Sequence, residues 1–239
     1  MTDDQDVRAD LLPGVPTPPP PPAHPRGRAA APPTDAAEWD ARYGGAERVW
    51  SGEPNGALVH EVRGLRPGRA LDVGCGEGAD AVWLAGHGWD VTALDVSGVA
   101  LSRARAHATA AGAAVTWVHG GLLDAALPAG AFDLVSAQYP ALRRTPDARA
   151  ERALVRLVAP GGTLLVVHHD TRHGSGEHGG GEHGGFDPDD WVLPRDVAPL
   201  LTAGWLVEVD EVRERAVRGG AGAHHTHDVV LRARRLGGG

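Results

Sequence analysis

Short apolar runs recur along the chain from about residue 70, and most are bounded by glycine, proline or charged residues. Runs of this length predict buried strands, which we expect at 70–73, 90–94, 115–119, 132–137, 163–168, 205–212 and 228–232. The segments between them carry apolar residues at helical spacing and predict helices. These helices are expected near 34–43, 55–63, 79–86, 97–111, 147–157 and 194–202.

The order of these elements predicts an α/β fold. Strands separated by helices of this length form right-handed parallel crossovers. The last two expected strands, 205–212 and 228–232, are joined by a loop without a helix and should pair antiparallel. We therefore expect a single doubly wound, Rossmann-like domain with a mostly parallel seven-stranded sheet that ends in an antiparallel hairpin.

The beginning of the chain differs from the rest in composition. Residues 1–33 are rich in proline, with an unbroken run from Pro18 to Pro22. Proline lacks the backbone N–H that helices and sheets use, so we expect a disordered or polyproline-like leader, with a docking motif as the alternative. The folded domain is expected to cover 34–235, and 236–239 to form a flexible tail.

Charge and cysteine content narrow the function classes. The net charge is −8 and no basic face stands out, which argues against nucleic acid as a partner. No apolar run approaches the roughly 20 residues needed to span a bilayer, so a membrane partner is not expected. Cys75 is the only cysteine and the chain starts with acidic residues, which favours a cytoplasmic protein.

A glycine-rich turn follows the first expected strand. Gly74, Gly76 and Gly78 allow a tight turn in which a ligand can approach bare backbone at the start of the next helix. Asp95 ends the second strand, where a carboxylate can accept hydrogen bonds from both hydroxyls of a ribose. Together these residues predict an adenosine-containing ligand at the carboxyl edge of the sheet.

Two cofactors fit such a turn. Gly74-x-Gly76-x-x-Ala79 satisfies the dinucleotide-binding pattern, which leaves an NAD-dependent oxidoreductase as an alternative. Asp72, however, would repel a pyrophosphate, whereas it suits the amino group of a methionine moiety. The third glycine also follows G-x-G-x-G spacing, and the expected hairpin departs from the all-parallel dinucleotide fold. These features favour S-adenosylmethionine.

The segment Leu71–Gly78 together with Asp95 resembles the class I S-adenosylmethionine-dependent methyltransferase family, over roughly 34–235. Within that family, Trp39-Asp-x-Arg-Tyr43 and Trp50–Asn55 are similar to the cofactor lid of the bacterial tellurite-resistance/thiopurine-type methyltransferase group. The alternative for these aromatic residues is an ordinary place in the core.

The resemblance implies a set of cofactor contacts. Asp72 and the glycines would hold the methionine end, Asp95 the ribose, and the segment after the third strand the adenine. The implied cofactor-binding residues are Trp39, Tyr43, Trp50, Asn55, Asp72, Gly74, Gly76, Asp95, Val96, Leu122, Leu123 and Ser136. The family often has an acidic residue after the third strand, but glycine stands there in this chain, and Asp124 could substitute from a shifted position. Ser136–Tyr139 would line the methyl-transfer site.

The cofactor suggests how a small-molecule acceptor would react. A sulfonium methyl group is already activated, so transfer needs alignment and exclusion of water more than a strong base. A soft sulfur, selenium or tellurium nucleophile would need almost no proton chemistry. For an oxygen or nitrogen acceptor, His168 or His169 could take the proton, with Tyr139 nearby as a third candidate catalytic residue.

Eight of the thirteen histidines follow residue 167. His168 and His169 end the fifth strand, and His225 and His227 begin the last one, so an antiparallel arrangement would bring the two pairs to one edge of the sheet. One interpretation is a transition-metal site, such as zinc, with these four side chains as ligands. The other is a metal-free acceptor pocket covered by the glycine-rich segment 174–185.

We therefore expect a methyltransferase that acts on a small molecule through a histidine-lined pocket. Besides the oxidoreductase, the second alternative is a non-catalytic cofactor-binding or metal-handling module on the same fold. Because pocket walls come from loops, the sequence leaves the acceptor undetermined, and it leaves the oligomeric state undetermined as well.

Overall fold

The computed structural model describes residues 35–170, 187–215 and 225–237. The expected leader (1–33), the segment 174–185 and the last two residues of the expected tail lie outside this described part. The helices are α1 (Ala36–Gly44), α2 (Gly56–Glu61), α3 (Ala79–Gly86), α4 (Gly98–Ala111), α5 (Arg149–Leu157) and α6 (Pro194–Val197), with 3₁₀ turns η1 (Pro188–Asp190) and η2 (Ala198–Leu200). The strands are β1 (Arg69–Val73), β2 (Asp90–Asp95), β3 (Val115–His119), β4 (Phe132–Gln138), β5 (Val158–His169), β6 (Trp205–Glu214) and β7 (His227–Arg235). Of the described helices, none is long and apolar enough to cross a bilayer.

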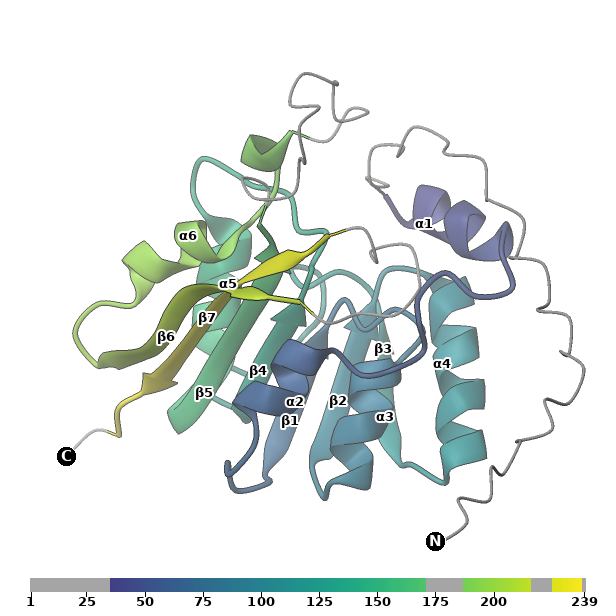
Figure 1. Ribbon diagram of the computed structural model, residues 1–239, viewed down its shortest axis with the longest axis horizontal. Helices are drawn as coiled ribbons and strands as arrows, with labels where there is room; N and C mark the ends of the chain where they lie inside the picture. Colours follow the sequence, from purple (N-terminus) through teal and green to yellow (C-terminus); the bar gives the residue numbers. More distant parts are fainter. Residues whose placement is uncertain (1–34, 171–186, 216–224, 238–239) are drawn as a thin grey trace, which may run out of the picture.

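The seven strands form one sheet in the order β3-β2-β1-β4-β5-β7-β6 (Figure 1). Neighbouring strands from β3 to β5 pair in parallel, whereas β7 pairs antiparallel with both β5 and β6. The expected mostly parallel sheet with an antiparallel end is therefore confirmed. The strand order reverses between β1 and β4, and open α/β sheets bind ligands at such a switch point, beyond the carboxyl ends of the strands.

Helices cover both faces of the sheet (Figure 1). Alternate residues of the central strands face opposite sides, so Leu134 of β4 packs with α2 and α3 whereas Val135 packs with α5. Both side chains are fully buried. This two-sided burial explains why the central strands are apolar at nearly every position.

Two expected elements differ from the structure for local reasons. The helix expected at 194–202 ends at Val197 and continues as the short turn η2. Pro199 lacks an N–H and its ring opposes the preceding helical turn, which ends the α-helix early. The strand expected at 163–168 begins earlier, because β5 starts at Val158 and includes 160–162, and its pairing with β4 shifts register between Phe132 and Leu134.

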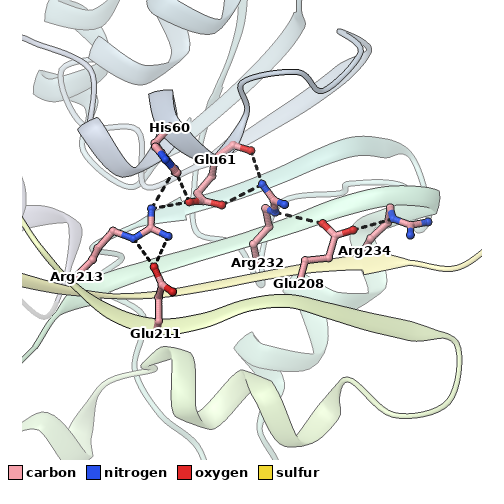
Figure 2. A network of polar contacts seen from close by, with 7 residues as sticks. All are labelled: His60, Glu61, Glu208, Glu211, Arg213, Arg232 and Arg234. Carbon is pink, nitrogen blue, oxygen red and sulfur yellow. Dashed lines mark hydrogen bonds and ion pairs between the residues drawn. The ribbon is translucent and has the colours of Figure 1, made fainter.

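A network of charged side chains ties α2 to the β6–β7 hairpin (Figure 2). The Glu61 carboxylate, 2% exposed, lies 2.6 Å from Arg213 Nη1 and 3.0 Å from Arg232 Nη1. Arg232 also donates to the backbone carbonyl of Glu61, and Glu208 links Arg232 to Arg234. The hairpin is thus fixed against a helix that lies directly before the strand carrying the glycine turn.

Candidate functional site

The glycine turn after β1 lies at the switch point of the sheet. Gly74, Gly76 and Gly78 have φ angles of 72°, 53° and 82°, a region that other side chains rarely adopt. The amides of Gly74 and Cys75 donate to the carbonyl of Leu94, which joins the turn to β2. The turn ends at Gly78, the N-cap of α3, and so presents bare backbone beside the start of a helix.

Asp72, the penultimate residue of β1, is 2% exposed. Its Oδ2 atom has no hydrogen-bond partner within the described ranges. Burial, followed by the charges of Asp80 and Asp95, raises the pKa of this carboxyl well above its usual value. A buried polar atom without a partner is costly, and a cationic donor bound here would satisfy it.

The neighbouring strand β4 supplies a second acceptor without a donor. Ser136 is fully buried and pairs in register with Asp72. The Nε2 atom of Gln138 donates to Ser136 Oγ over 3.0 Å, while Gln138 Oε1 is buried without a partner in the described structure. Two adjacent strands therefore carry acceptor oxygens that lack donors, an arrangement that fits an ammonium group with its three N–H bonds.

Asp95 closes β2 and is 7% exposed. Its carboxylate accepts hydrogen bonds from the amides of Gly76 and Ser97, each over 2.8 Å. Burial raises the pKa of Asp95, although these two amides act in the opposite direction. Because a carboxylate offers about four lone-pair sites, Asp95 can still accept from ribose hydroxyls. It also ties the glycine turn to β2, which the sequence alone did not indicate.

Aromatic side chains from α1 and the following loop contact the glycine turn. Trp50 Nε1 donates to Tyr43 Oη over 2.9 Å, and a Cβ atom built on Gly76 would lie 2.9 Å from that hydroxyl. The ring centroids of Trp39 and Tyr43 are 5.8 Å apart, and the Arg42 guanidinium lies 5.3 Å from the rings of Trp39 and Trp50. Burial raises the pKa of Tyr43, which keeps its hydroxyl protonated at neutral pH. The structure thus brings the three expected lid aromatics together.

Glu77 and Arg103 hold this aromatic segment in place. The Glu77 carboxylate accepts from the Trp50 amide over 3.1 Å and from Arg103 Nη1 over 2.8 Å. Arg103 Nη2 donates to the carbonyls of Tyr43 and Ala46. Neither residue was expected from the sequence, where the available signal was the position of Glu77 inside the glycine turn.

Asn55 contacts an aspartate that neighbours the site. Its backbone amide and its Nδ2 atom donate to the two carboxylate oxygens of Asp80, each over 2.7 Å. Asp80 is 6% exposed, and its charge is one cause of the raised pKa of Asp72. The structure therefore connects Asn55 with Asp72 only indirectly, through Asp80.

The residues expected to flank adenine follow β2 and β3. A Cβ atom on Gly121 would lie 3.7 Å from Val96 Cγ1 and 3.0 Å from Asp124 Oδ2, so the loop after β3 packs beside Val96. Leu122 is buried, whereas Leu123 is 43% exposed. Val96 and this loop thus form one continuous part of the carboxyl edge, next to Asp95.

A second group of polar side chains lies where β4 and β5 end and β7 begins. Tyr139 directly follows β4 and has a φ of 51°, which is uncommon for a bulky residue. Its hydroxyl donates to Asp228 Oδ2 over 2.7 Å and accepts from Arg215 Nε over 3.1 Å. The His169 ring stacks on Tyr139 with ring centroids 4.2 Å apart, and its Nδ1 lies 3.4 Å from Asp228 Oδ1.

The two adjacent histidines have different environments. His168 is 8% exposed, and burial, followed by the neighbouring His169, lowers its pKa to about 4. Its ring meets the Tyr139 ring edge-on at 6.5 Å. His168 is therefore neutral at physiological pH, whereas the side chain of His169 is 17% exposed and lies against a carboxylate.

The expected metal site is not found among the described residues. The rings of His169 and His225 stack 3.9 Å apart with planes at 12°, and parallel rings do not direct their in-plane nitrogen lone pairs to one point. His227 Nδ1 lies 2.9 Å from Thr226 Oγ1. In the part of the chain that the structure describes, no three His, Cys, Asp or Glu side chains are arranged to hold a metal ion, so the metal interpretation for His168, His169, His225 and His227 is not supported. Four further histidines, His173, His178, His183 and His224, lie outside the described residues.

Known proteins share both the sequence and the fold of this region. Residues 70–162 match a family model described as a methyltransferase domain. An uncharacterized methyltransferase of Mycobacterium tuberculosis is 43% identical over 112 residues, which cover 46% of this chain and 55% of that protein. A ubiquinone biosynthesis O-methyltransferase of Cronobacter sakazakii is 34% identical over 131 residues, covering 49% of this chain and 54% of the relative.

These findings show that residues 70–162 resemble methyltransferase domains. The methyltransferase match includes the glycine turn, Asp72 and Asp95. The chain spans about half the length of the curated relatives it matches.

Solved structures share the fold over most of the chain. A structure concerned with the conversion of a disulfide bond into a thioacetal group during echinomycin biosynthesis has a TM-score of 0.66 and 28% identity, covering 84% of this chain and 92% of that one. A methyltransferase of Methanosarcina mazei has a TM-score of 0.57 at 20% identity, covering 76% and 98%. TehB from Haemophilus influenzae has a TM-score of 0.57 at 13% identity, covering 75% and 62%, which shows a shared fold alone.

Proposed function

We propose that this protein transfers the methyl group of S-adenosylmethionine to a small-molecule acceptor. The observation that carries the proposal is the buried Oδ2 of Asp72 beside the glycine turn at the switch point, which no donor among the described residues contacts. The ammonium group of a methionine moiety has the charge and the hydrogen-bond donors that this oxygen lacks. A pyrophosphate would meet repulsion from the same carboxylate, which disfavours NAD.

The residues present fit this cofactor from end to end. Asp72 and Gln138 would hold its amino group, and Asp95 its ribose hydroxyls. The remaining proposed contacts are with Gly74, Gly76, Val96, Leu122, Leu123 and Ser136, beneath the lid of Trp39, Tyr43 and Trp50. When bound, the cofactor supplies a methyl group on a sulfonium sulfur, which is already electrophilic.

The chain's own part in catalysis is alignment and exclusion of water. Holding two reactants in line removes much of the entropic barrier to transfer. The Tyr43–Trp50 pair contacts the glycine turn, and Glu77 and Arg103 fix the segment that carries it. We infer that this lid separates the reacting atoms from solvent.

For the acceptor, we propose a small organic molecule bound at the group around Tyr139 and His169. The names of similar proteins support two kinds of acceptor atom. The ubiquinone biosynthesis O-methyltransferases suggest oxygen, and the echinomycin structure suggests sulfur. The expected relation to the tellurite-resistance/thiopurine group has only the fold of TehB in its favour. A soft sulfur, selenium or tellurium nucleophile is therefore the alternative acceptor.

Cofactor binding tests the proposal directly. We expect S-adenosylhomocysteine, the product form of the cofactor, to raise the melting temperature of the full chain while NAD does not, because only a ligand of the native state stabilises it. Asp95→Asn should weaken S-adenosylhomocysteine at least about tenfold by calorimetry, since a charge-assisted hydrogen bond is worth roughly 1.5–3 kcal/mol. Asp90→Asn, at the exposed start of the same strand, is the control and should bind as the wild type does.

The choice of Asn rather than Ala at position 95 follows from the structure. Because Asp95 accepts the amides of Gly76 and Ser97, alanine would also break the turn. An amide oxygen can keep one of these hydrogen bonds. Folded wild-type protein that binds no S-adenosylhomocysteine at millimolar concentration would refute the proposed function.

A further inference from the structure

A pocket of about 460 Å³ lies between the start of α5 and the segment that carries η1, α6 and η2. The helices α5 and α6 are neighbours on one face of the sheet (Figure 1). The volume is in the range of small-molecule sites, roughly 300–1,000 Å³. No described residue that lines this pocket belongs to the proposed cofactor contacts or to the group around Tyr139 and His169.

Glu151, which lines the pocket, is a buried carboxylate on the apolar side of α5. It is 2% exposed, and Leu154, about one helical turn later, is fully buried. Helical spacing therefore favours an apolar residue at position 151. Instead, the Oε2 atom of Glu151 is buried with no hydrogen-bond partner in the part of the chain that the structure describes. A buried charge without a partner is costly, so this carboxylate needs an explanation other than packing.

The place of Glu151 in the helix does not supply a partner for this oxygen. Glu151 is the third residue of α5 after the N-cap Ala148, a position where a glutamate can accept a hydrogen bond from the N-cap amide. Here the Ala148 amide donates to the carbonyl of Thr145 over 2.9 Å instead. The helix dipole favours a negative charge in this turn but gives Oε2 no donor. Capping therefore does not account for Glu151.

The other charged side chains that line the pocket are paired with one another. Arg195 Nη2 lies 2.8 Å from Asp189 Oδ1, and Arg144 Nε lies 3.4 Å from Asp196 Oδ1. When these two pairs cancel, the negative charge of Glu151 is left. The side chains of Arg144 and Arg195 are 44% and 51% exposed, so they form the rim of the pocket, whereas Glu151 lies at its inner end.

We propose that this pocket binds a small organic molecule through a primary ammonium group, and that the Glu151 carboxylate recognises that group. An ammonium carries a positive charge and three N–H donors, which match an acceptor that has neither a counter-ion nor a donor. Pro146, Ala148 and Pro199 provide apolar surface for the body of such a ligand. The site is separate from the proposed cofactor site, and the inference does not depend on methyl transfer.

The two walls of the pocket are joined by backbone hydrogen bonds. The Arg144 amide donates to the carbonyl of Asp190, and the Val192 amide donates to the carbonyl of Leu142, each over 2.9 Å. These contacts connect the loop after β4 to the segment before α6. Because the walls are already held together, a ligand has less ordering entropy to overcome on binding.

Amide chemical-shift mapping by NMR tests the location of the site in the full chain. The probes are phenethylamine and phenethyl alcohol, which differ only in an ammonium against a hydroxyl group. A primary ammonium group such as that of lysine has a pKa of about 10.4 and is charged at pH 7. We expect phenethylamine to shift the amide signals of 144–151 and 189–199. The alcohol should bind at least about tenfold more weakly, because it cannot form the charge-assisted hydrogen bond.

Glu151→Gln tests whether the charge of this residue recognises the amine. The amide keeps the size of the side chain, so affinity for phenethylamine should fall about tenfold or more while affinity for the alcohol changes by less than about twofold. A merely structural role would alter both affinities alike. The melting temperature should not fall, since an unpaired buried charge is removed.

Two further variants complete the test. Asp147→Asn removes a nearby negative charge at an exposed residue outside the pocket lining, and should bind phenethylamine within about twofold of the wild type. Glu151→Asp keeps the charge on a shorter side chain and should retain a preference for the amine over the alcohol, which provides a second reading if the Gln variant does not fold.

Several outcomes would overturn the inference. Amide shifts confined to 72–78 would place the amine at Asp72 instead, and no shifts at millimolar amine would leave the pocket without the proposed ligand. Equal affinities of the wild type for amine and alcohol, or unchanged affinity in Glu151→Gln, would remove the role of Glu151. Binding of S-adenosylhomocysteine is measured separately, so a failure of the proposed function and a failure of this inference are distinguishable.

Discussion

Asp72 is a carboxylate whose folded environment opposes its own charge. Burial is the main cause, and Asp80 and Asp95 add like charges nearby. A group in this position costs stability in the free protein and becomes favourable only when a cation binds. Functional sites often contain groups that lower the stability of the free protein and that contribute to ligand binding.

We expect Asp72→Asn to raise the stability of the free protein and to weaken cofactor binding. An acid whose folded pKa is raised makes stability fall as the pH rises from its ordinary value, about 3.8, towards the raised value. Removing the charge removes that loss, so the melting temperature at pH 7 should increase. Affinity for S-adenosylhomocysteine should fall about tenfold, the loss of a hydrogen bond to a charged group.

The pH dependence provides the check on this prediction. Wild-type affinity should increase with pH as Asp72 ionises, whereas the Asn variant should show a flatter profile by calorimetry between pH 5.5 and 8.5. Asp80 and Asp95 also have raised pKa values, so the difference between the two profiles is the informative quantity. A variant less stable than wild type at pH 7 would contradict the account of Asp72.

At the scale of elements, α1 and its loop depend on side chains from other parts of the chain. Asp40 of α1 accepts from Ser97 Oγ over 2.6 Å and from the Val99 amide over 3.1 Å, which joins α1 to the start of α4. Glu77 and Arg103 hold the loop after α1. The lid is therefore attached at both of its ends by polar contacts rather than by a large apolar core.

Glu77→Gln should loosen the lid. The neutral amide cannot form an ion pair with Arg103. The free energy of unfolding, measured in urea, should therefore fall by about 1–2 kcal/mol. Binding of S-adenosylhomocysteine should weaken several-fold, and cleavage by a protease within 43–50 should become faster. Glu47→Gln, an exposed change in the same loop, is the matched control. If Glu77→Gln and Glu47→Gln had the same stability, affinity and cleavage rate, the role of Glu77 in holding the lid would be refuted.

The ionic network on α2 leads to a prediction about acid stability. Burial raises the pKa of Glu61, but the hydrogen bonds from His60 and Arg213 and the nearby arginine charges outweigh it, and the net pKa is lowered. A lowered folded pKa stabilises the protein above the ordinary value of about 4.5 and loses this effect as the pH falls through the folded value. The network should therefore contribute fully at pH 7 and weaken only in acid.

Glu61→Gln should lower the free energy of unfolding at pH 7 by about 2 kcal/mol. Breaking a fully buried ion pair costs roughly 3–5 kcal/mol. The expected cost is smaller here because Arg213 and Arg232 are partly exposed. The loss should be smaller at pH 3.5. Glu211→Gln removes an exposed partner of Arg213 and should cost less than about 1 kcal/mol. Chemical denaturation at the two pH values measures both, and equal costs for the two variants would contradict the burial argument.

At the scale of the whole molecule, two groups of polar side chains lie along one edge of the sheet. The proposed cofactor residues lie where β1 and β2 end, and the Tyr139–His169–Asp228 group lies where β4 and β5 end and β7 begins. Reversal of strand order between β1 and β4 puts the boundary between them at the switch point. A methyl donor on one side and an acceptor on the other is the arrangement that this topology favours.

We predict that deletion of residues 1–33 leaves the melting temperature unchanged within about two degrees. Among the residues that the structure describes, the core clusters on both faces of the sheet are formed from Trp39 onward. Differential scanning calorimetry of the shortened and the full chain measures this. A loss of several degrees would show that the leader contributes to the folded domain.

The sequence by itself determined the elements, their order and the cofactor edge. Apolar runs, glycines and prolines act within a few residues, so β1, the glycine turn and the position of Asp95 followed from local patterns. The absence of a helix between the last two strands was sufficient to predict the antiparallel end of the sheet. Local patterns were wrong at some element boundaries, for example where Pro199 shortened a helix that apolar spacing had extended.

Only the tertiary structure decided which side chains meet. Asp228 is 59 residues from His169 and 89 from Tyr139, and Glu77 is 26 from Arg103. Such contacts depend on strand register and on loop paths, and a shift of one residue in a strand turns a side chain to the opposite face. For that reason the sequence suggested a metal site at the histidines. In the folded chain, however, the rings of His169 and His225 stack, and His169 lies against the Asp228 carboxylate.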